Sequence, residues 1–262
     1  MKFVFHLIVF VILTIFTQIG GVIYIISIYI SREWKCTFKF KTSIVFVTLY
    51  IIATFVIVPP LASLWGRERV KNTPVIQPAN YASILLNRNY VRPKMNKLLQ
   101  KTARNLQGTP IKIHYLDANF PFFNGFPLLP HMSHNDGKKI DLSLIYETKK
   151  GEISNKQKSI SGYGVFVAPH KGEFDQTKDC KQKGYFQYDY TKYLTFGKIN
   201  KKLVFSEKGT KRLIESILKN RNLGKIFIEP HLKKRLHLRD KRIRFHGCRA
   251  VRHDDHIHIQ LK

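Results

Sequence analysis

Two long apolar runs open the chain. Residues 3–30 carry no charged side chain and only five polar ones, and residues 43–64 form a second run of the same kind. Each run reaches the roughly 20 apolar residues that a helix needs to cross a bilayer. The first run is too long for the apolar core of a signal peptide, and no small-residue cleavage motif follows it. We therefore predict a two-helix transmembrane hairpin over residues 1–65.

Basic residues flank the second apolar run on both sides. Four Lys and Arg lie in the loop between the runs, and three follow the second run within residues 66–71. The small excess in the loop favours a cytoplasmic loop with both chain ends outside. Residues 66–92 are polar and contain Pro74 and Pro78, which predicts a linker.

From residue 93 onward the hydrophobic pattern changes between helical and strand spacing. Apolar residues recur at helical spacing after Pro93, whereas those of residues 140–146 alternate as in a strand. The same reasoning predicts further strands at residues 111–116, 163–168, 225–229 and the C-terminus, and further helices at residues 206–220 and 231–236. This succession predicts an α+β domain over residues 93–262, with a small antiparallel sheet and flanking helices.

The charge of the chain points to an anionic partner or surface. The formal net charge is +28, of which +22 falls after residue 71, and residues 233–252 hold nine Lys and Arg against one Asp. Such a domain should meet nucleic acid, a membrane surface or an acidic cell-wall polymer. A solvated basic surface without a specific partner is the plainer interpretation.

The number and spacing of the cysteines limit which cysteine-based sites the chain can form. Cys36, Cys180 and Cys248 include no C-x-x-C pair, which excludes a zinc finger. Cys180 and Cys248 share the C-terminal domain and would form a disulfide outside the cytoplasm, or remain two buried thiols.

The most unusual stretch lies at the C-terminus. Three histidines and two aspartates fall within His253-Asp254-Asp255-His256-Ile257-His258. On a strand, His256 and His258 would point to one face, from which they could hold or flank a metal ion. His253 and His256 cannot share a regular strand face, so we expect a bend at the two aspartates. These aspartates would orient imidazoles, bind a substrate ammonium group or simply lie in a solvated turn.

A second group of ligand-type residues lies upstream. His134 precedes Asp141 by seven positions, with Gly137 between them to turn the chain. Asp141 stands between apolar neighbours on a predicted strand, which favours a position facing a cleft. Together with His258 these residues supply two imidazoles and one carboxylate, the donor set of a catalytic zinc site with an open position.

These motifs resemble those of a known family. The pattern His131-x-x-His134-x-x-Gly137-x-x-x-Asp141, followed far downstream by residues 253–258, is similar to penicillin-insensitive murein endopeptidase. That family belongs to the wider group of lysostaphin-type, D-Ala-D-Ala carboxypeptidase and Hedgehog-type zinc domains. The resemblance covers roughly residues 109–261 and is patchy in the middle.

The resemblance implies a role for each matching residue. Zinc would be bound by His134, Asp141 and His258, and His256 and His253 would be the catalytic histidines. The supporting residues would be His131, Asp254 and Asp255. Two departures are that Gln260 stands where the family usually has Arg, and that a membrane hairpin replaces the cleaved signal.

We therefore expect a membrane-anchored zinc metallopeptidase that hydrolyses D-amino-acid peptide bonds of peptidoglycan, in particular its crosslinks. Its catalytic domain would hold a zinc cleft on the periplasmic side of the inner membrane. Acidic envelope polymers are further expected partners, and nucleic acid is the disfavoured one. Two alternatives remain open: a non-catalytic zinc-containing binding module, and a basic membrane-anchored binder of nucleic acid or another anionic polymer.

Overall fold

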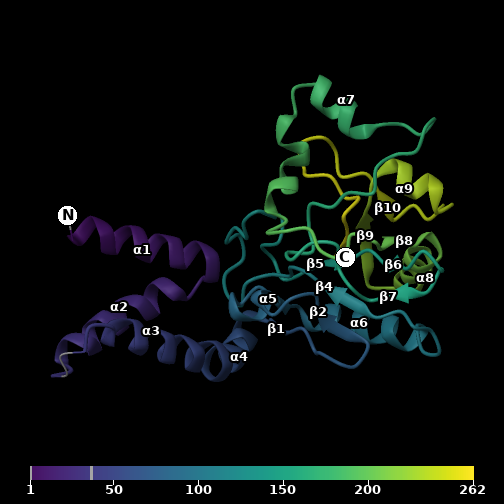
Figure 1. Cartoon of the computed structure of the whole chain (residues 1–262). Coiled ribbons are helices and arrows are strands. Elements are labelled where there is room, and N and C mark those ends of the chain that lie inside the picture. The colour runs from purple at the N-terminus through teal and green to yellow at the C-terminus, as the bar shows by residue number, and fades with distance from the viewer. Residues whose placement is uncertain (1, 36–37) are drawn as a thin grey trace. The chain divides into compact units, whose positions relative to one another are not determined.

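The computed structural model describes residues 2–35 and 38–262, so Cys36 lies outside the described residues. The chain forms two compact units of mixed α and β structure, which confirms the predicted α+β class (Figure 1). The first unit comprises Met1–Val70, Ala82–Pro93 and Ala118–Gly137, and the second comprises Lys71–Tyr81, Lys94–Asp117 and Lys138–Lys262. The domain limits expected from the sequence, at residues 65 and 92, stay a prediction.

One helix of the first unit is long and apolar enough, by length and composition, to cross a membrane. It runs from Lys41 to Trp65 with a mean hydropathy of 2.4. Its successive parts are α3 (Lys41–Ile52), the π-helical turn η1 (Ala53–Ile57), α4 (Val58–Ala62) and the 3-10 turn η2 (Ser63–Trp65). Pro59 and Pro60 have no N–H to donate within the helix, and the wider π turn before them lets the chain continue.

The first apolar run differs from the continuous helix that we expected over residues 3–30. It forms two helices that contact each other, α1 (Lys2–Thr17) and α2 (Gly20–Glu33). Gln18 separates them with a φ of 67°, and the hydroxyl of Thr17 accepts a hydrogen bond from the N–H of Gly20 at 2.8 Å. Polar Thr17 and Gln18, followed by two glycines, therefore interrupt the helix where hydropathy alone predicts continuity.

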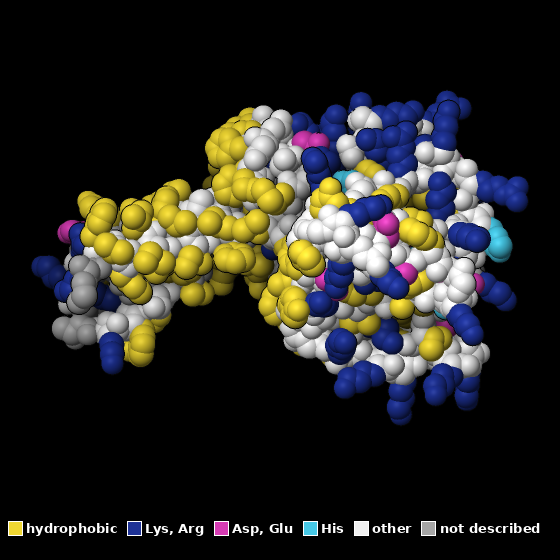
Figure 2. All heavy atoms as spheres, turned by 90° about the horizontal axis from the view of Figure 1, so that it is seen from above, with side chains coloured by type: hydrophobic (Ala, Val, Ile, Leu, Met, Phe, Trp, Pro, Cys, Tyr) yellow, Lys and Arg dark blue, Asp and Glu magenta, His cyan; other side chains and the backbone are white. Residues whose placement is uncertain are grey.

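The two short helices pack closely because of Gly21. A Cβ atom at this position would stand 2.1 Å from the hydroxyl oxygen of Thr14 and 2.6 Å from the carbonyl oxygen of Phe10. Glycine is thus required at this crossing, as at many helix contacts in membranes. Large apolar side chains cover the outer faces of these helices, as Figure 2 shows for one face.

The remainder of the first unit packs on the C-terminal end of the long helix. Strand β1 (Glu68–Arg69) pairs antiparallel with β3 (Tyr90–Val91), and α5 (Ala82–Leu85) precedes β3. Val58, Ala62 and Tyr90 form a buried cluster, against which Ile19 and Phe122 pack. Segments 82–93 and 118–137 are therefore folded onto the apolar helices.

The second unit is organised around a six-stranded sheet of order β10-β9-β11-β5-β4-β2. Its strands are β2 (Ile76–Pro78), β4 (Ile113–Tyr115), β5 (Lys139–Ser143), β9 (Leu223–Phe227), β10 (Ile243–Arg244) and β11 (His256–Leu261). The central strands β9, β11, β5 and β4 are antiparallel, as predicted. The edge pairs β10–β9 and β2–β4 are parallel, so the sheet is mixed and not purely antiparallel.

Helices and a smaller sheet complete the second unit. The helices are α6 (Pro93–Asn105), α7 (Gln176–Gln182), the 3-10 segment η3 (Phe186–Leu194), α8 (Glu207–Leu218) and α9 (Pro230–Arg235). The hydroxyl of Ser206 accepts the N–H of Gly209 and so caps α8, as its sequence predicts. The small sheet has the order β7 (Ile153–Ser154), β6 (Tyr146–Glu147), β8 (Val204–Phe205).

The strand predicted at residues 163–168 is wrong. This segment is irregular, because Gly162 and Gly164 adopt positive φ angles of 86° and 79°. The N–H of Gly164 donates to the carboxylate of Asp255 at 2.6 Å and not to a neighbouring strand. The segment thus contacts the C-terminal histidine stretch through individual hydrogen bonds and does not pair with it as a strand.

Cys180 and Cys248 form a disulfide, which decides between the two options left open by the sequence. The bond links α7 to the loop before β11 across 68 positions. Closing a loop of this size in the unfolded chain corresponds to a stabilisation of about 4 kcal/mol in the chain-entropy account.

Candidate functional site

Asp141 and His258 lie opposite each other at the centre of the large sheet. The antiparallel register of β5 and β11 pairs Asp141 with His258 and Ser143 with His256. The Asp141 and His258 side chains are both buried, and Nδ1 of His258 is hydrogen-bonded to Oδ1 of Asp141 at 2.9 Å. Because side chains alternate along a strand, His256 and His258 share this face, whereas Ile257 and Ile259 enter the core on the other.

His256 is held in a fixed orientation by its neighbours. Its Nδ1 is hydrogen-bonded to Oδ1 of Asp255 at 2.5 Å, and its Nε2 lies 3.8 Å from Oδ1 of Asp141. The Tyr163 hydroxyl donates to Oδ2 of Asp141 at 2.9 Å, and the Tyr163 ring meets the His256 ring edge-on at 5.1 Å between centroids. Carboxylates beside both ring nitrogens favour the protonated, imidazolium form of His256.

His253 lies beside His256 and His258, with which it forms a histidine cluster, although a bend in the chain separates it from their strand. The chain bends at Asp254 and Asp255, as the spacing of the histidines predicts. The ring of His253 lies 4.8 Å from that of His256, centroid to centroid. The His253 N–H donates to Glu229 at 3.0 Å, and the hydroxyl of Tyr188 donates to the same carboxylate at 2.7 Å. The buried Glu229 therefore fixes the backbone that presents His253.

Asp254 belongs to a buried ion pair and is not a solvated turn residue. The guanidinium of Arg252 donates to both of its carboxylate oxygens, with a distance of 2.7 Å from Nε to Oδ1. The Asp254 carbonyl accepts the N–H of Val167 at 2.8 Å, and His231 lies 3.7 Å from the Asp254 carboxylate. Asp254 thus stabilises the bend, whereas Asp255 points toward His256.

Burial and charge shift the pKa values of these groups in opposite directions. Burial lowers the pKa of His256, but the carboxylates of Asp141 and Asp255 outweigh it and raise the pKa to about 9. Burial, followed by the neighbouring imidazoles, holds the pKa of His253 well below its usual value. Burial raises the pKa of Asp254 to about 7 in spite of Arg252, and also raises the pKa of Glu229.

His246 is a member of the cluster that the sequence did not reveal. Its ring stacks on Phe227 at 4.2 Å and lies 5.2 Å from His253 and 6.0 Å from His258. It is exposed, so this side of the cluster meets solvent. The only sequence signal was its place in a basic segment before the final strand, which carries no periodicity. The pairing of β9 with β11 brings Phe227 to this position, and the pairing of β10 with β9 brings His246.

The upstream histidines lie on the segment 118–137 of the first unit. Nδ1 of His134 is hydrogen-bonded to the carbonyl oxygen of Ala118 at 2.6 Å, and the His134 N–H donates to the carbonyl of His131 at 2.9 Å. Both side chains are buried. A carbonyl on one ring nitrogen fixes the tautomer of an imidazole that uses its other nitrogen as a metal ligand.

His131, His134 and Asp141 form a group that could hold a metal ion. One ligand atom of each lies within 4.8 Å of the others, and all three residues are buried. Two imidazoles with one carboxylate are a donor set that catalytic zinc uses, so the chemistry of these residues fits zinc. The sequence assigned His258 to this set and gave His131 a supporting role, and that choice stays a prediction.

Sequence comparisons add no relative to this picture. Neither protein-family models nor curated proteins match the chain.

Proposed function

We propose that the protein is a membrane-anchored zinc metallopeptidase that hydrolyses D-amino-acid peptide bonds of peptidoglycan, in particular its crosslinks. The observation that carries the proposal is a donor group of imidazoles and a carboxylate together with two further buried histidines: the ring of His256 is bonded to a carboxylate, and the backbone of His253 is held by another. A non-catalytic zinc site needs the donors but has no use for His253 and His256. The resemblance of these motifs to murein endopeptidases supplies the substrate class.

Different residues of the chain would bind the metal and transfer protons. His134, Asp141 and His258 would hold the zinc ion, and Tyr163 keeps the Asp141 carboxylate in place through its hydroxyl. Bound zinc supplies a Lewis acid that polarises the scissile carbonyl. With Asp141 bound to zinc, less negative charge would face His256, which would then accept a proton from the attacking water at Nε2 while Asp255 holds Nδ1.

His253 would act on the leaving side of the scissile bond. Its ring lies beside that of His256 at 4.8 Å, and Glu229 anchors its backbone. From this position the neutral ring of His253 would stabilise the oxyanion, or pass to the departing amine a proton received from His256. Asp255 and Glu229 are positioning residues in this scheme.

A location outside the cytoplasm is supported by two features of the chain. The helix Lys41–Trp65 is suited to a membrane, and the disulfide Cys180–Cys248 is of a kind that persists in oxidising compartments. We propose the inner membrane with the catalytic residues on the periplasmic side. Our expectation of two spans becomes a proposal of one full span with α1 and α2 packed beside it. A reporter fused after Lys262 should be active only outside the cytoplasm, and cytoplasmic activity would refute this orientation.

The proposed function is tested on the purified full-length chain. We expect about one zinc ion per chain by metal analysis and cleavage of crosslinked muropeptides, followed by mass spectrometry. Removal of the metal by a chelator should abolish cleavage, and added zinc should restore it. Zinc binding without any hydrolysis would instead favour the non-catalytic module.

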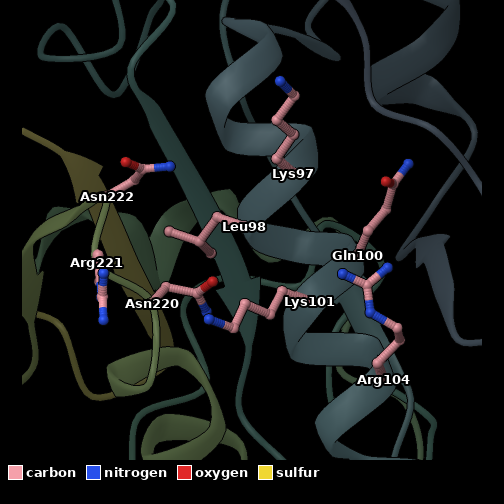
Figure 3. A pocket seen from close by; sticks show the side chains of 8 residues that line it. All are labelled: Lys97, Leu98, Gln100, Lys101, Arg104, Asn220, Arg221 and Asn222. Atoms are coloured by element: carbon pink, nitrogen blue, oxygen red, sulfur yellow. The ribbon is translucent and has the colours of Figure 1, made fainter.

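A basic hollow on the second unit favours a second candidate function, the binding of an acidic polymer. The hollow has a volume of about 290 Å³ and lies between α6 and the turn after α8. Figure 3 shows Lys97, Lys101 and Arg104 along α6, and Arg221 on the facing turn. Among the described residues these four cations form no ion pair with an acid. A polymer of phosphate groups would supply the missing negative charge.

The polymer prediction concerns three cations of α6. Replacing Lys97, Lys101 and Arg104 together with Glu should raise the Kd for poly(glycerol phosphate) by about tenfold or more at low salt and reduce its salt dependence. The matched control replaces Lys208, Lys211 and Arg212 of α8 with Glu, which changes the net charge equally. Equal losses in both variants, measured by fluorescence anisotropy, would show that only overall charge matters.

A further inference from the structure

The segment Ala118–Gly137, called here the histidine loop, is built onto the apolar helices. It carries His131 and His134 and belongs to the same compact unit as α1 to α4. The side chain of Gln18, at the break between α1 and α2, forms two hydrogen bonds with the backbone of Phe122. Its amide nitrogen donates to the carbonyl at 3.0 Å, and its amide oxygen accepts the N–H at 2.8 Å. The polar break in the first apolar run thus has a partner in the histidine loop.

Arg67 is a second attachment of the histidine loop, directly after the long helix. It is 1% exposed, and arginine is rarely buried so completely. Its guanidinium donates to five acceptors of the loop: the carbonyls of Phe120, Phe122, Phe123 and Asn135, and the side-chain oxygen of Asn124. Burial, with Arg92 nearby, lowers the pKa of Arg67 to about 10, so the guanidinium stays charged at neutral pH.

Arg92 links the end of the histidine loop to the end of the helix. Its guanidinium donates to the carbonyl of Trp65 at 3.1 Å and to the carbonyl of Asp136 at 3.1 Å. A single guanidinium group therefore connects the helix end with a residue two positions after His134. The rings of Trp65 and Phe122 are also in contact, at 4.9 Å between centroids. Tryptophan at the end of an apolar helix is typical of the membrane–water interface.

We propose that the histidine loop is held at the membrane surface by Gln18, Arg67 and Arg92, so that the site takes peptides carried on lipid-linked molecules close to the bilayer. This inference rests on the proposed function, because it uses His134 as a ligand of the metal. A site assembled on this loop lies near the helix end, and a substrate on a distant polymer strand must approach the bilayer to reach it. A peptide attached to a lipid is already there.

The first test uses the wild-type chain in lipid nanodiscs. The substrates are one D-amino-acid peptide attached to a lipid through spacers of increasing length, and the same peptide free in solution. We expect the fastest cleavage with the shortest spacers and a fall of about tenfold when the spacer reaches several nanometres. A rate that rises with spacer length would overturn the proposal. Absence of cleavage for every substrate, the free peptide included, would refute the proposed function instead.

The second test measures zinc affinity and needs no activity. Gln18→Ala and Arg67→Gln each remove contacts of the histidine loop and should weaken zinc binding by about tenfold or more. The control Arg69→Gln changes an arginine of the same unit that donates to Thr54 and Tyr90. Thermal unfolding of all three variants accounts for a general loss of stability. If the control weakens zinc binding as much as the other two, the loop attachments are not specific.

Discussion

The His258→Ala variant is expected to lose its zinc and all peptidase activity. His258 stands opposite Asp141 in the β5–β11 register and is hydrogen-bonded to it at 2.9 Å. Loss of an outer-shell partner of a metal ligand lowers metal affinity by about 10- to 100-fold, so loss of a ligand should exceed a hundredfold. Metal analysis after dialysis should show less than a tenth of the wild-type zinc.

Three further variants make this result decisive. His170→Ala removes an exposed histidine of the same unit and should leave zinc content and activity unchanged. His131→Ala tests the other candidate for the third ligand, because His131 groups with His134 and Asp141. Full zinc in His258→Ala with loss in His131→Ala would transfer the ligand role to His131. Full zinc in His258→Ala, His131→Ala and His134→Ala alike would refute the site.

The His256→Ala variant is expected to keep its zinc and lose activity. We assign His256 to proton transfer and not to the metal, and removal of a general base typically costs about 10²- to 10⁴-fold in rate. Asp255→Asn should give a smaller loss, since it keeps the His256 ring and alters only the group that accepts from Nδ1 and from the N–H of Gly164. The measurement is kcat on a crosslinked muropeptide at equal zinc content.

Other outcomes of this experiment are equally informative. Loss of zinc in His256→Ala would make it a ligand and would require another base. Unchanged kcat would remove His256 from the reaction, and His253 would then be the residue to replace next. His246→Ala is a variant for comparison, because His246 belongs to the same histidine cluster but lies outside residues 253–258, where it is exposed and stacks on Phe227.

Local patterns predicted the regular elements well, because each pattern is a direct consequence of which face is buried. The helix after Pro93, the helix capped by Ser206 and the strands around Asp141 and at the C-terminus lie close to where periodicity placed them. The bend at Asp254 and Asp255 followed from the parity of a strand, since three histidines with this spacing cannot share one face. The long helix that ends at Trp65 followed from its apolar length.

Contacts between segments far apart in the chain could not be predicted from the sequence. Gln18 looked like a tolerated polar residue inside a span, and its partner Phe122 lies 104 positions away. Arg67 looked like an interfacial charge, whereas the fold buries it among carbonyls of the histidine loop. The parallel edge strands and the position of His246 likewise depend on which strands become neighbours, and no local pattern encodes this.

Composition and spacing were enough to predict the long apolar helix, the α+β pattern and the charge, and to name candidate metal ligands. The tertiary structure decided which of these residues meet. Strand register placed His258 opposite Asp141, Asp255 oriented the ring of His256, and Glu229 held the backbone of His253. The fold also builds the histidine loop on the apolar helices, because an unpaired buried guanidinium or amide is costly and the loop supplies acceptors to Arg67 and Gln18.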